Sequence, residues 1–420
     1  MSNMIGSVGF NPASYPVAET RTEAMPKAER QPETASDSVS IGCDRAEAMP
    51  KKKWTVLLYS AADNNLETSL VKDVAELESV GSSDQMNLVV QLDRGKNPSS
   101  ISGGWKGCKR FYLNQDNDKN KINSPALADL GNVNMSDPKV LSDFIQWGMK
   151  EYPAENYILI MSDHGAGWPG ALQDVSHNDF ASTPALREGI EDAEKKTGQK
   201  INIIGFDACL MASTEVAYEL AEAGDYMVAS QNVEGGDGWP YSKIFSGDTA
   251  KALKGALEQK FDVSPEEVAK KMVNDSYGFP SITTLAAMDL SKMKDLAAAT
   301  DRMAEVIMQS PHDRGTLRSM AAKTKSWEGF RDQYDFADKI IANPKINNPE
   351  LKEAAKAMQK ALSEVIIAEQ HEIDEEDGAH GLSLEISTGG VKQEGYADLK
   401  FAKDTRWDEA MKWLGKNKNK

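Results

Sequence analysis

The sequence predicts an α/β fold on a mostly parallel sheet, followed by a helix-rich C-terminal half. Expected strands and helices alternate between residues 54 and 230, and the strands are continuous apolar runs such as WTVLLYS at 54–60 and YILIMS at 157–162. Continuous apolar strands are typical of a sheet that helices cover on both faces. The expected strands are 54–60, 86–92, 109–113, 157–162, 201–206 and 226–230, and the expected helices are 66–80, 138–150, 183–197 (N-capped by Thr183) and 213–223.

The chain divides into three parts by composition. Residues 1–52 are rich in Pro, Ser, Ala, Glu and Thr, and we expect a disordered tail because such a segment has too few apolar groups to order itself. Residues 53–250 form the expected α/β core. Residues 251–420 are expected to pack on this core or complete it, since no long linker separates them. Helices are expected there at 265–275, 291–310, 330–341 and 349–370, and short strands at 281–288 and 381–386.

Charge and composition exclude several classes of function. The net charge of −17 argues against nucleic-acid binding and leaves room for a basic substrate or partner, although an acidic surface that keeps the protein soluble is the simpler reason for the excess charge. No apolar run approaches the roughly 18 residues that span a bilayer, so we expect no membrane association. The N-terminus lacks a basic start followed by an apolar core, which makes the cytoplasm the default location and export without a signal peptide the alternative. Three cysteines cannot build a disulfide framework.

Two expected strands end in residues that can carry chemistry. The strand at 157–162 runs into Asp163-His164-Gly165, and the strand at 201–206 runs into Asp207-Ala208-Cys209. Because the carboxyl ends of parallel strands meet at one edge of a sheet, we expect His164 and Cys209 to lie together. A Cys thiolate with a His partner is the minimum for nucleophilic acyl transfer, although either residue alone is more often structural.

We expect the surroundings of Cys209 to favour the thiolate. A helix predicted to begin near Ser213 and a protonated His164 would both lower the pKa of the thiol. The backbone N–H groups of Gly165 and Cys209 are the candidates for an oxyanion hole.

These motifs resemble the clostripain family of cysteine peptidases. The strings that carry the resemblance are Trp54–Glu67, Asp163–Trp168, Gly205–Ala212, Gly235–Tyr241, Gly381–Ile386 and Tyr396–Trp407, in this order. The resemblance implies a caspase-like α/β/α sandwich and an endopeptidase that cleaves after Arg or Lys through a Cys-His dyad. It also implies that Asp207 and Asp237 line the specificity pocket. A pair of carboxylates would indeed bind a guanidinium or ammonium group, although Asp207 as a helix N-cap and Asp237 as a turn residue remain the alternatives.

No cofactor is required by the sequence. The His and Cys residues lack the spacing of a metal site, so no metal ligands are predicted. Calcium is the one open option, because the resemblance includes calcium-dependent relatives and the acidic run at 372–377 offers oxygen ligands. The alternative to an enzyme is a catalytically silent peptide-binding protein that retains the fold.

Self-cleavage, if the chain cleaves after basic residues, is expected in the tail. The segment 165–186 after His164 contains no Arg or Lys, whereas Arg45 and Lys51–Lys53 precede the first expected strand.

Overall fold

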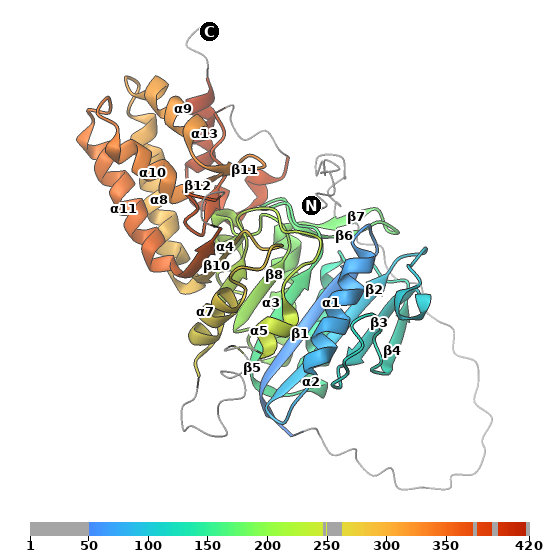
Figure 1. The fold of residues 1–420 in the computed structure, drawn as a ribbon. Helices are drawn as coiled ribbons and strands as arrows, with labels where there is room; N and C mark the ends of the chain where they lie inside the picture. The colour runs from blue at the N-terminus through green and yellow to red at the C-terminus, as the bar shows by residue number, and fades with distance from the viewer. Residues whose placement is uncertain (1–49, 247–248, 250–262, 373–375, 389–393, 417–420) are drawn as a thin grey trace, which may run out of the picture.

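A nine-stranded sheet organises the protein (Figure 1). The computed structural model describes residues 50–246, 249, 263–372, 376–388 and 394–416. The sheet contains β1 (Lys52–Ala62), β2 (Met86–Arg94), β3 (Gly107–Tyr112), β4 (Ala126–Gly131), β5 (Ala154–Ser162), β8 (Ile203–Asp207), β9 (Tyr226–Ala229), β10 (Thr284–Asp289) and β13 (Ile366–His371). Two small sheets contain β6 (Ala171–Asp174) with β7 (Asp179–Ala181), and β11 (Ser326–Trp327) with β12 (Phe330–Asp332) and β14 (Ser383–Leu384).

The strand order in the large sheet is β13-β10-β9-β8-β5-β1-β2-β3-β4. The five central strands, from β9 to β2, pair in parallel. The strands β10 and β13 at one edge, and β3 and β4 at the other, pair antiparallel. The predicted α/β class with a largely parallel central sheet is therefore confirmed.

Helices cover both faces of this sheet. The α-helices are α1 (Glu67–Val80), α2 (Pro138–Glu151), α3 (Thr183–Thr197), α4 (Thr214–Glu219), α5 (Tyr241–Ser246), α7 (Pro265–Asp275), α8 (Met293–Met308), α9 (Arg314–Lys323), α10 (Gln333–Ala342), α11 (Pro349–Val365), α12 (Lys400–Asp404) and α13 (Trp407–Gly415). Short 3₁₀ helices are η2 (Ile101–Gly104), η3 (Leu290–Lys292) and η4 (Tyr396–Asp398).

Strand β1 shows why its sequence is apolar throughout. Successive side chains of a strand point to opposite faces, so Leu57 and Tyr59 enter the core shared with α2, α3 and α4. Val56 and Leu58 enter the second core, which α1, α5 and α7 close on the other face. Both faces are thus buried, and an alternating polar pattern would place polar groups in a core.

The C-terminal half contributes to the sheet as well as covering it. Its strands β10 and β13 extend the sheet beyond β9. Helices α8, α10, α11 and α13 pack against one another beside that edge (Figure 1). In the described part of the chain, no helix is both long enough and apolar enough to cross a membrane.

Two of the predicted C-terminal helices are wrong in part. The segment 330–341 begins as strand β12, and Asp332 then caps α10 by accepting from the backbone N–H three residues on. The segment 349–370 is helical only to Val365, after which Ile366 begins β13. Residues from Ile366 onward are extended because they pair with β10 at the edge of the sheet. The local sequence pattern cannot predict a partner so distant in the chain.

Two predictions near helix and strand starts also need correction. Ser182, and not Thr183, caps α3, because the Ser182 hydroxyl accepts from Ala185 N at 3.3 Å. Lys52 and Lys53, expected before the first strand, belong to β1, where Lys52 N donates to Pro153 O at 3.0 Å. Residues 1–49, including Arg45, lie outside the described residues.

Candidate active site

His164 and Cys209 lie beyond the paired ends of two neighbouring parallel strands. Ser162 of β5 is in register with Asp207 of β8, and each candidate residue follows two positions later. The two following segments touch: a Cβ atom placed on Gly165 would lie 2.3 Å from Cys209 O and 3.0 Å from Cys209 N. A side chain at position 165 would collide with this backbone, and the structure places the segments that carry His164 and Cys209 against each other at one edge of the sheet.

An asparagine from the turn after β1 holds the imidazole of His164. Asn65 Oδ1 lies 2.8 Å from His164 Nε2, and because a carbonyl oxygen only accepts, Nε2 carries the proton and Nδ1 is the basic nitrogen. Burial lowers the pKa of His164. Sequence analysis missed Asn65, although its position just past a strand at the same sheet edge was a usable signal.

The segment that carries His164 is tied to the same turn. Asn64 Nδ2 donates to Asp163 Oδ1 at 2.7 Å and to Gln173 O at 3.1 Å. The Gln173 N–H in turn donates to Asp163 Oδ2. The fully buried Asp163 thus fixes the backbone from which His164 projects.

The thiol of Cys209 is not activated in the way that the sequence suggested. Its pKa is raised to about 12, first by burial and further by the carboxylates of Glu234 and Asp207. Helix α4 has six residues and begins at Thr214, and the Ser213 side chain caps its first turn by accepting from Val216 N. The favourable contact is the Glu234 N–H, which donates to Cys209 Sγ at 3.3 Å.

Asp207 is buried beside the thiol. Its Oδ2 accepts from Ser162 Oγ at 2.9 Å and from Tyr241 OH at 2.8 Å. A Cβ atom on Gly238 would lie 3.1 Å from Asp207 Oδ2 and 3.0 Å from Asp73 Oδ2. The backbone of the Gly-Gly-Asp-Gly loop therefore passes directly over two carboxylates.

Asp207 belongs to a group with Asp73 of α1 and Glu234. Among the described residues, one oxygen of Asp73 is buried without a hydrogen-bond partner, whereas Glu234 shares a side-chain hydrogen bond with Asp207. Burial, and then the Asp207 carboxylate, raise the pKa of both residues well above the usual range. The pKa of Asp207 is raised as well, chiefly by burial. In the described part of the chain, none of the three carboxylates forms an ion pair.

Sequence analysis predicted the partners of Asp207 only in part. Asp237 is exposed, and its charge ranks behind Asp207 and Glu76 in raising the pKa of Asp73. Asp73 and Glu234 were missed. Asp73 lies three residues after Leu70 on the buried face of α1, and a charged residue on such a face was the available signal.

The tryptophans after the two glycine-rich segments are buried packing residues. Trp168 makes an edge contact with Tyr396, with ring centroids 5.0 Å apart. Trp239 is fully buried and its Nε1–H donates to Glu234 Oε1 at 3.2 Å. Trp239 therefore orients one of the buried acids.

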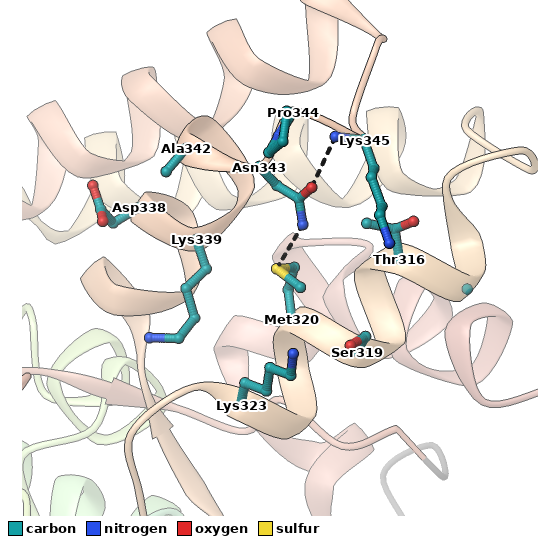
Figure 2. A pocket seen from close by; sticks show the side chains of 11 residues that line it. Thr316, Ser319, Met320, Lys323, Asp338, Lys339, Ala342, Asn343, Pro344 and Lys345 are labelled. Atoms are coloured by element: carbon teal, nitrogen blue, oxygen red, sulfur yellow. Dashed lines mark hydrogen bonds between the residues drawn. The ribbon is translucent and has the colours of Figure 1, made fainter.

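Two hollows of about 530 Å³ each lie in the C-terminal region, away from His164 and Cys209. The first lies between α9 and α10, where Asn343 bridges Met320 and Lys345 (Figure 2). The second is lined by charged groups that include Asp335 and His371. Neither hollow contains the candidate catalytic residues, so neither belongs to this site.

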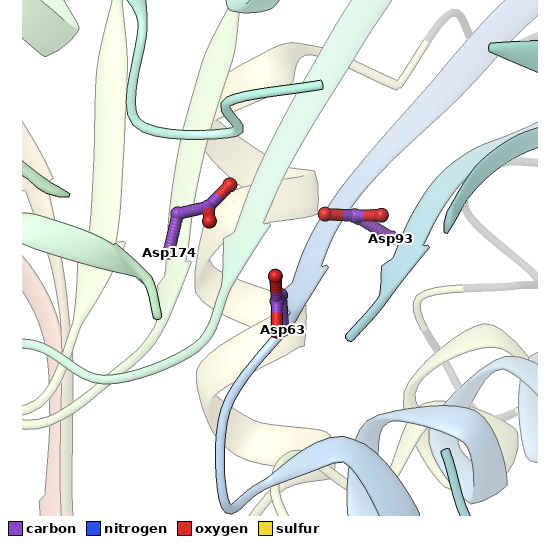
Figure 3. A group of neighbouring side chains, drawn as sticks. All are labelled: Asp63, Asp93 and Asp174. Atoms are coloured by element: carbon purple, nitrogen blue, oxygen red, sulfur yellow. The ribbon is translucent and has the colours of Figure 1, made fainter. Parts of the chain in front are cut away.

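The structure brings together three carboxylates that the sequence did not place in one group. One oxygen each of Asp63, Asp93 and Asp174 lies within 4.8 Å of the other two, at the ends of β1, β2 and β6 (Figure 3). Burial, then the charges of Asp174 and Asp63, raise the pKa of Asp93 to about 8, and the nearby Arg94 N–H offsets part of this rise.

The acidic run at 372–377 is a poorer candidate for cations. Glu376 already accepts from Asn232 and Trp327 and pairs with Lys325. Residues 373–375 lie outside the described residues.

A thiol and an imidazole at adjoining strand ends of an α/β sheet are the groups that a cysteine peptidase requires. The family model of the clostripain family (peptidase C11) matches residues 58–413, and the chain belongs to this family of cysteine peptidases.

Known proteins agree with this assignment. The chain is 27% identical over 410 residues to clostripain of Hathewaya histolytica, covering 82% of this chain and 76% of that protein. Its fold is similar to a secreted C11 cysteine protease from Bacteroides thetaiotaomicron in complex with an irreversible peptide inhibitor, with a TM-score of 0.59 and 21% identity over 86% of this chain and 99% of the other. An inactive zymogen C11 protease from Parabacteroides distasonis gives a TM-score of 0.59 and 21% identity over 85% and 99%.

Proposed function

We propose that this cysteine peptidase is an endopeptidase that cleaves protein or peptide substrates after Arg or Lys, with Cys209 as nucleophile and His164 as general base and acid. One observation carries the specificity: Glu234 and Asp207 lie beside the thiol, Asp73 adjoins Asp207 under Gly238, and none of the three forms an ion pair among the described residues. A buried group of acids without a counter-ion is suited to a cation that arrives with the substrate.

The raised pKa values suggest how the pocket exchanges protons for substrate. In the free protein, burial and mutual repulsion keep protons on part of the group formed by Asp73, Asp207 and Glu234. A guanidinium or ammonium group stabilises the ionised carboxylates, so binding of an Arg or Lys side chain releases protons. An Arg side chain can also be held by two parallel hydrogen bonds.

In the proposed mechanism, His164 Nδ1 takes the proton of the Cys209 thiol as the sulfur attacks the substrate carbonyl. Asn65 keeps the Nε2 proton in place and so presents the correct tautomer. The imidazolium then protonates the leaving amine, which breaks the peptide bond and leaves a thioester on Cys209. Water, deprotonated by His164, hydrolyses the thioester and restores the thiol.

The oxyanion of the tetrahedral intermediate is assigned to the backbone N–H groups of Gly165 and Cys209. These two backbones adjoin, because a Cβ atom placed on Gly165 would lie only 2.3 Å from Cys209 O. Each donor would be worth on the order of 3 kcal/mol in the transition state.

Hydrolysis of short fluorogenic peptides that end in Arg, Lys, Leu or Asp tests this function. We expect turnover after Arg and Lys alone, its loss in Cys209→Ala and after iodoacetamide, and its retention in Cys43→Ala and Cys108→Ala. Equal cleavage after Leu would contradict the acidic pocket. Binding of an Arg peptide without cleavage of any substrate would favour the silent peptide-binding protein.

Location and processing are tested on the same protein. One relative is described as secreted, which favours export over the cytoplasmic default, and cell fractionation distinguishes the two. Self-cleavage is now expected at Arg45 or Lys51, since Lys52 and Lys53 belong to a strand. A new N-terminus between His164 and Cys209, seen only in the active protein, would contradict this expectation.

A further inference from the structure

The backbone directly after Cys209 adopts a conformation that needs support from the rest of the fold. Leu210 has a φ of 67°, in the left-handed region that side chains of this size rarely adopt. A strained residue of this kind persists only where its surroundings hold it in place. Because Leu210 follows the candidate nucleophile, the groups that hold its backbone also set the direction of the Cys209 side chain.

A short segment after β9, residues 230–234, provides this support. Asn232 O accepts from Leu210 N at 3.1 Å. The Glu234 N–H donates to Cys209 Sγ at 3.3 Å. The first hydrogen bond holds the backbone after Cys209 and the second holds its sulfur. A shift of residues 230–234 would therefore displace both at once.

Asn232 is fixed by hydrogen bonds from every polar atom of its side chain. Its Nδ2 donates to Thr283 Oγ1 at 3.0 Å and to Glu376 Oε1 at 2.7 Å. Its Oδ1 accepts from Val233 N at 2.7 Å, and its backbone N–H donates to Thr284 Oγ1 at 3.1 Å. Because a carboxylate only accepts, Nδ2 must be the atom that faces Glu376. The partners thus leave Asn232 one orientation.

Glu376 brings the C-terminal half of the chain into contact with Asn232. Among the described residues of the acidic run 372–377, Glu376 alone is buried, with 7% of its surface exposed. Its Oε2 accepts from Trp327 Nε1 at 2.7 Å and lies 3.1 Å from Lys325 Nζ. All three partners of this carboxylate are donors, so its position is set by β11 on one side and transmitted to Asn232 on the other.

The neighbouring residue of the same segment has a second tie to the C-terminal half. Gln231 Nε2 donates to Asp332 Oδ2 at 3.0 Å, and Gln231 Oε1 accepts from Gly381 N at 2.7 Å. Gln231 and Asp332 are both buried. Two consecutive side chains of residues 230–234 are therefore anchored in a part of the chain that the proposed mechanism does not use.

We propose that Asn232 and Glu376 are positioning residues that hold the Cys209 thiol in place for attack. This inference rests on the proposed function of Cys209 as the nucleophile. Asn232 acts through the backbone of Leu210, and Glu376 acts through the amide of Asn232, so neither needs to touch the substrate. The reactivity of the thiol thereby depends on the C-terminal half, to which Glu376 belongs.

Exchange of the two polar groups tests the pair. Asn232→Asp keeps the shape of the side chain but sets a second carboxylate against Glu376. Glu376→Gln offers an amide N–H to partners that all donate. Because a displacement of about 1 Å at a reacting group can cost about 100-fold in rate, each variant should lower kcat on fluorogenic Arg peptides by up to about 100-fold. The factor by which KM rises should be smaller.

The double variant Asn232→Asp/Glu376→Gln is the decisive measurement. The new amide at position 376 can donate to the new carboxylate at position 232 and still accept from Trp327 Nε1. The hydrogen bond returns with its direction reversed, so we expect the double variant to recover most of the lost kcat. Thermal unfolding is followed for every variant, and kinetics are measured well below each Tm, so that only folded chains contribute.

Asn202→Asp is the matched control. Asn202 Nδ2 donates to Asp225 Oδ2 at 2.9 Å, and its Oδ1 accepts from Tyr157 N at 2.9 Å. This asparagine has the same kind of partners as Asn232, but it precedes β8 and so lies at the opposite end of the strand from Cys209. Its replacement should leave kcat unchanged, whatever its effect on Tm.

Each remaining outcome would overturn the inference. These outcomes are a normal kcat in folded Asn232→Asp, an equal loss of kcat in Asn202→Asp, and a folded double variant as slow as the single ones. If Asn232→Asp does not fold, Glu376→Gln and the double variant decide. If neither single variant folds, the pair is needed for folding and the positioning role is refuted. Failure of the proposed function is distinct, because Cys209→Ala would then remain active.

Discussion

Filling the acidic pocket with a small cation should make Cys209 more reactive. The pKa of the thiol, about 12, is raised by burial and then by the carboxylates of Glu234 and Asp207. Methylguanidinium, a minimal mimic of an Arg side chain, would place a positive charge beside these carboxylates without covering the sulfur, and its full effect is expected at an alkaline pH at which it displaces no proton from them. The expected result is faster alkylation of Cys209 by uncharged iodoacetamide.

The size of this effect follows from the charges. A guanidinium about 6 Å from the sulfur, at an effective dielectric constant near 20, stabilises the thiolate by about 3 kcal/mol, or about two pKa units. Thiolate would then become about 100-fold more abundant at a pH below the pKa. Because a less basic thiolate is a weaker nucleophile, the net gain in alkylation rate is about tenfold.

The assay follows alkylation of the Cys209 peptide by mass spectrometry under mildly alkaline conditions. Methylurea, similar in shape but uncharged, is the control ligand and should have no effect. Cys108 is the internal control, because it is buried on β3, which β5, β1 and β2 separate from β8. Equal rates with methylguanidinium and methylurea would refute the electrostatic link between pocket and thiol.

Five substitutions extend the test to the rest of the site. His164→Ala should lower kcat by about 100- to 10,000-fold with little change in KM. Asn65→Ala should lower kcat by a smaller factor. If steady-state kinetics show an unchanged kcat for either variant, that residue has no part in the mechanism. Asp207→Asn should lower kcat/KM for Arg substrates by a factor that corresponds to a loss of about 2–5 kcal/mol of transition-state stabilisation. Asp237→Asn should lower it less, because the Asp237 side chain is exposed. A larger effect at Asp237 would reverse the assignment. Asp73→Asn should weaken cleavage after Arg yet stabilise the fold at alkaline pH. The raised pKa of Asp73 means that the folded state holds its proton longer than the unfolded state, so the free energy of unfolding falls as pH rises past the ordinary carboxyl range. Denaturant titrations at acidic and alkaline pH measure this difference in the free energy of unfolding. If Asp73→Asn is no more stable than the unmodified protein at the alkaline pH, the reasoning is contradicted.

The sequence was sufficient for the parallel centre of the sheet and for the pairing of the two strands that precede the candidate residues, for a physical reason. Strands buried on both faces must be continuously apolar, and their carboxyl ends share one edge, so His164 and Cys209 could be expected together. The C-terminal errors have the opposite origin. Ile366 follows a strongly helical segment, and only its distant partner strand β10 makes it extended.

The electrostatics of the site could not be predicted in the same way. The expectation that the Cys209 thiol is activated rested on two groups: the end of a helix that follows Cys209 closely in the sequence, and His164, which the motif suggested as its partner. It could not include Glu234, which is brought to Cys209 by a loop 25 residues further on. The sign of the pKa shift of a buried group depends on such neighbours and on burial itself, and both are properties of the folded chain.

His164 lies between two groups of buried acids, and the cost of burying these acids requires an explanation. Asp73, Asp207 and Glu234 lie toward β8, and Asp63, Asp93 and Asp174 lie toward β1 and β2. Burying carboxylates without a counter-ion opposes folding, so neither group is explained by stability. The first group becomes favourable when a cation arrives on a substrate side chain. Until then, the raised pKa values keep protons on part of this group, so the formal net charge of −17 overstates the charge that the folded chain carries at this edge of the sheet.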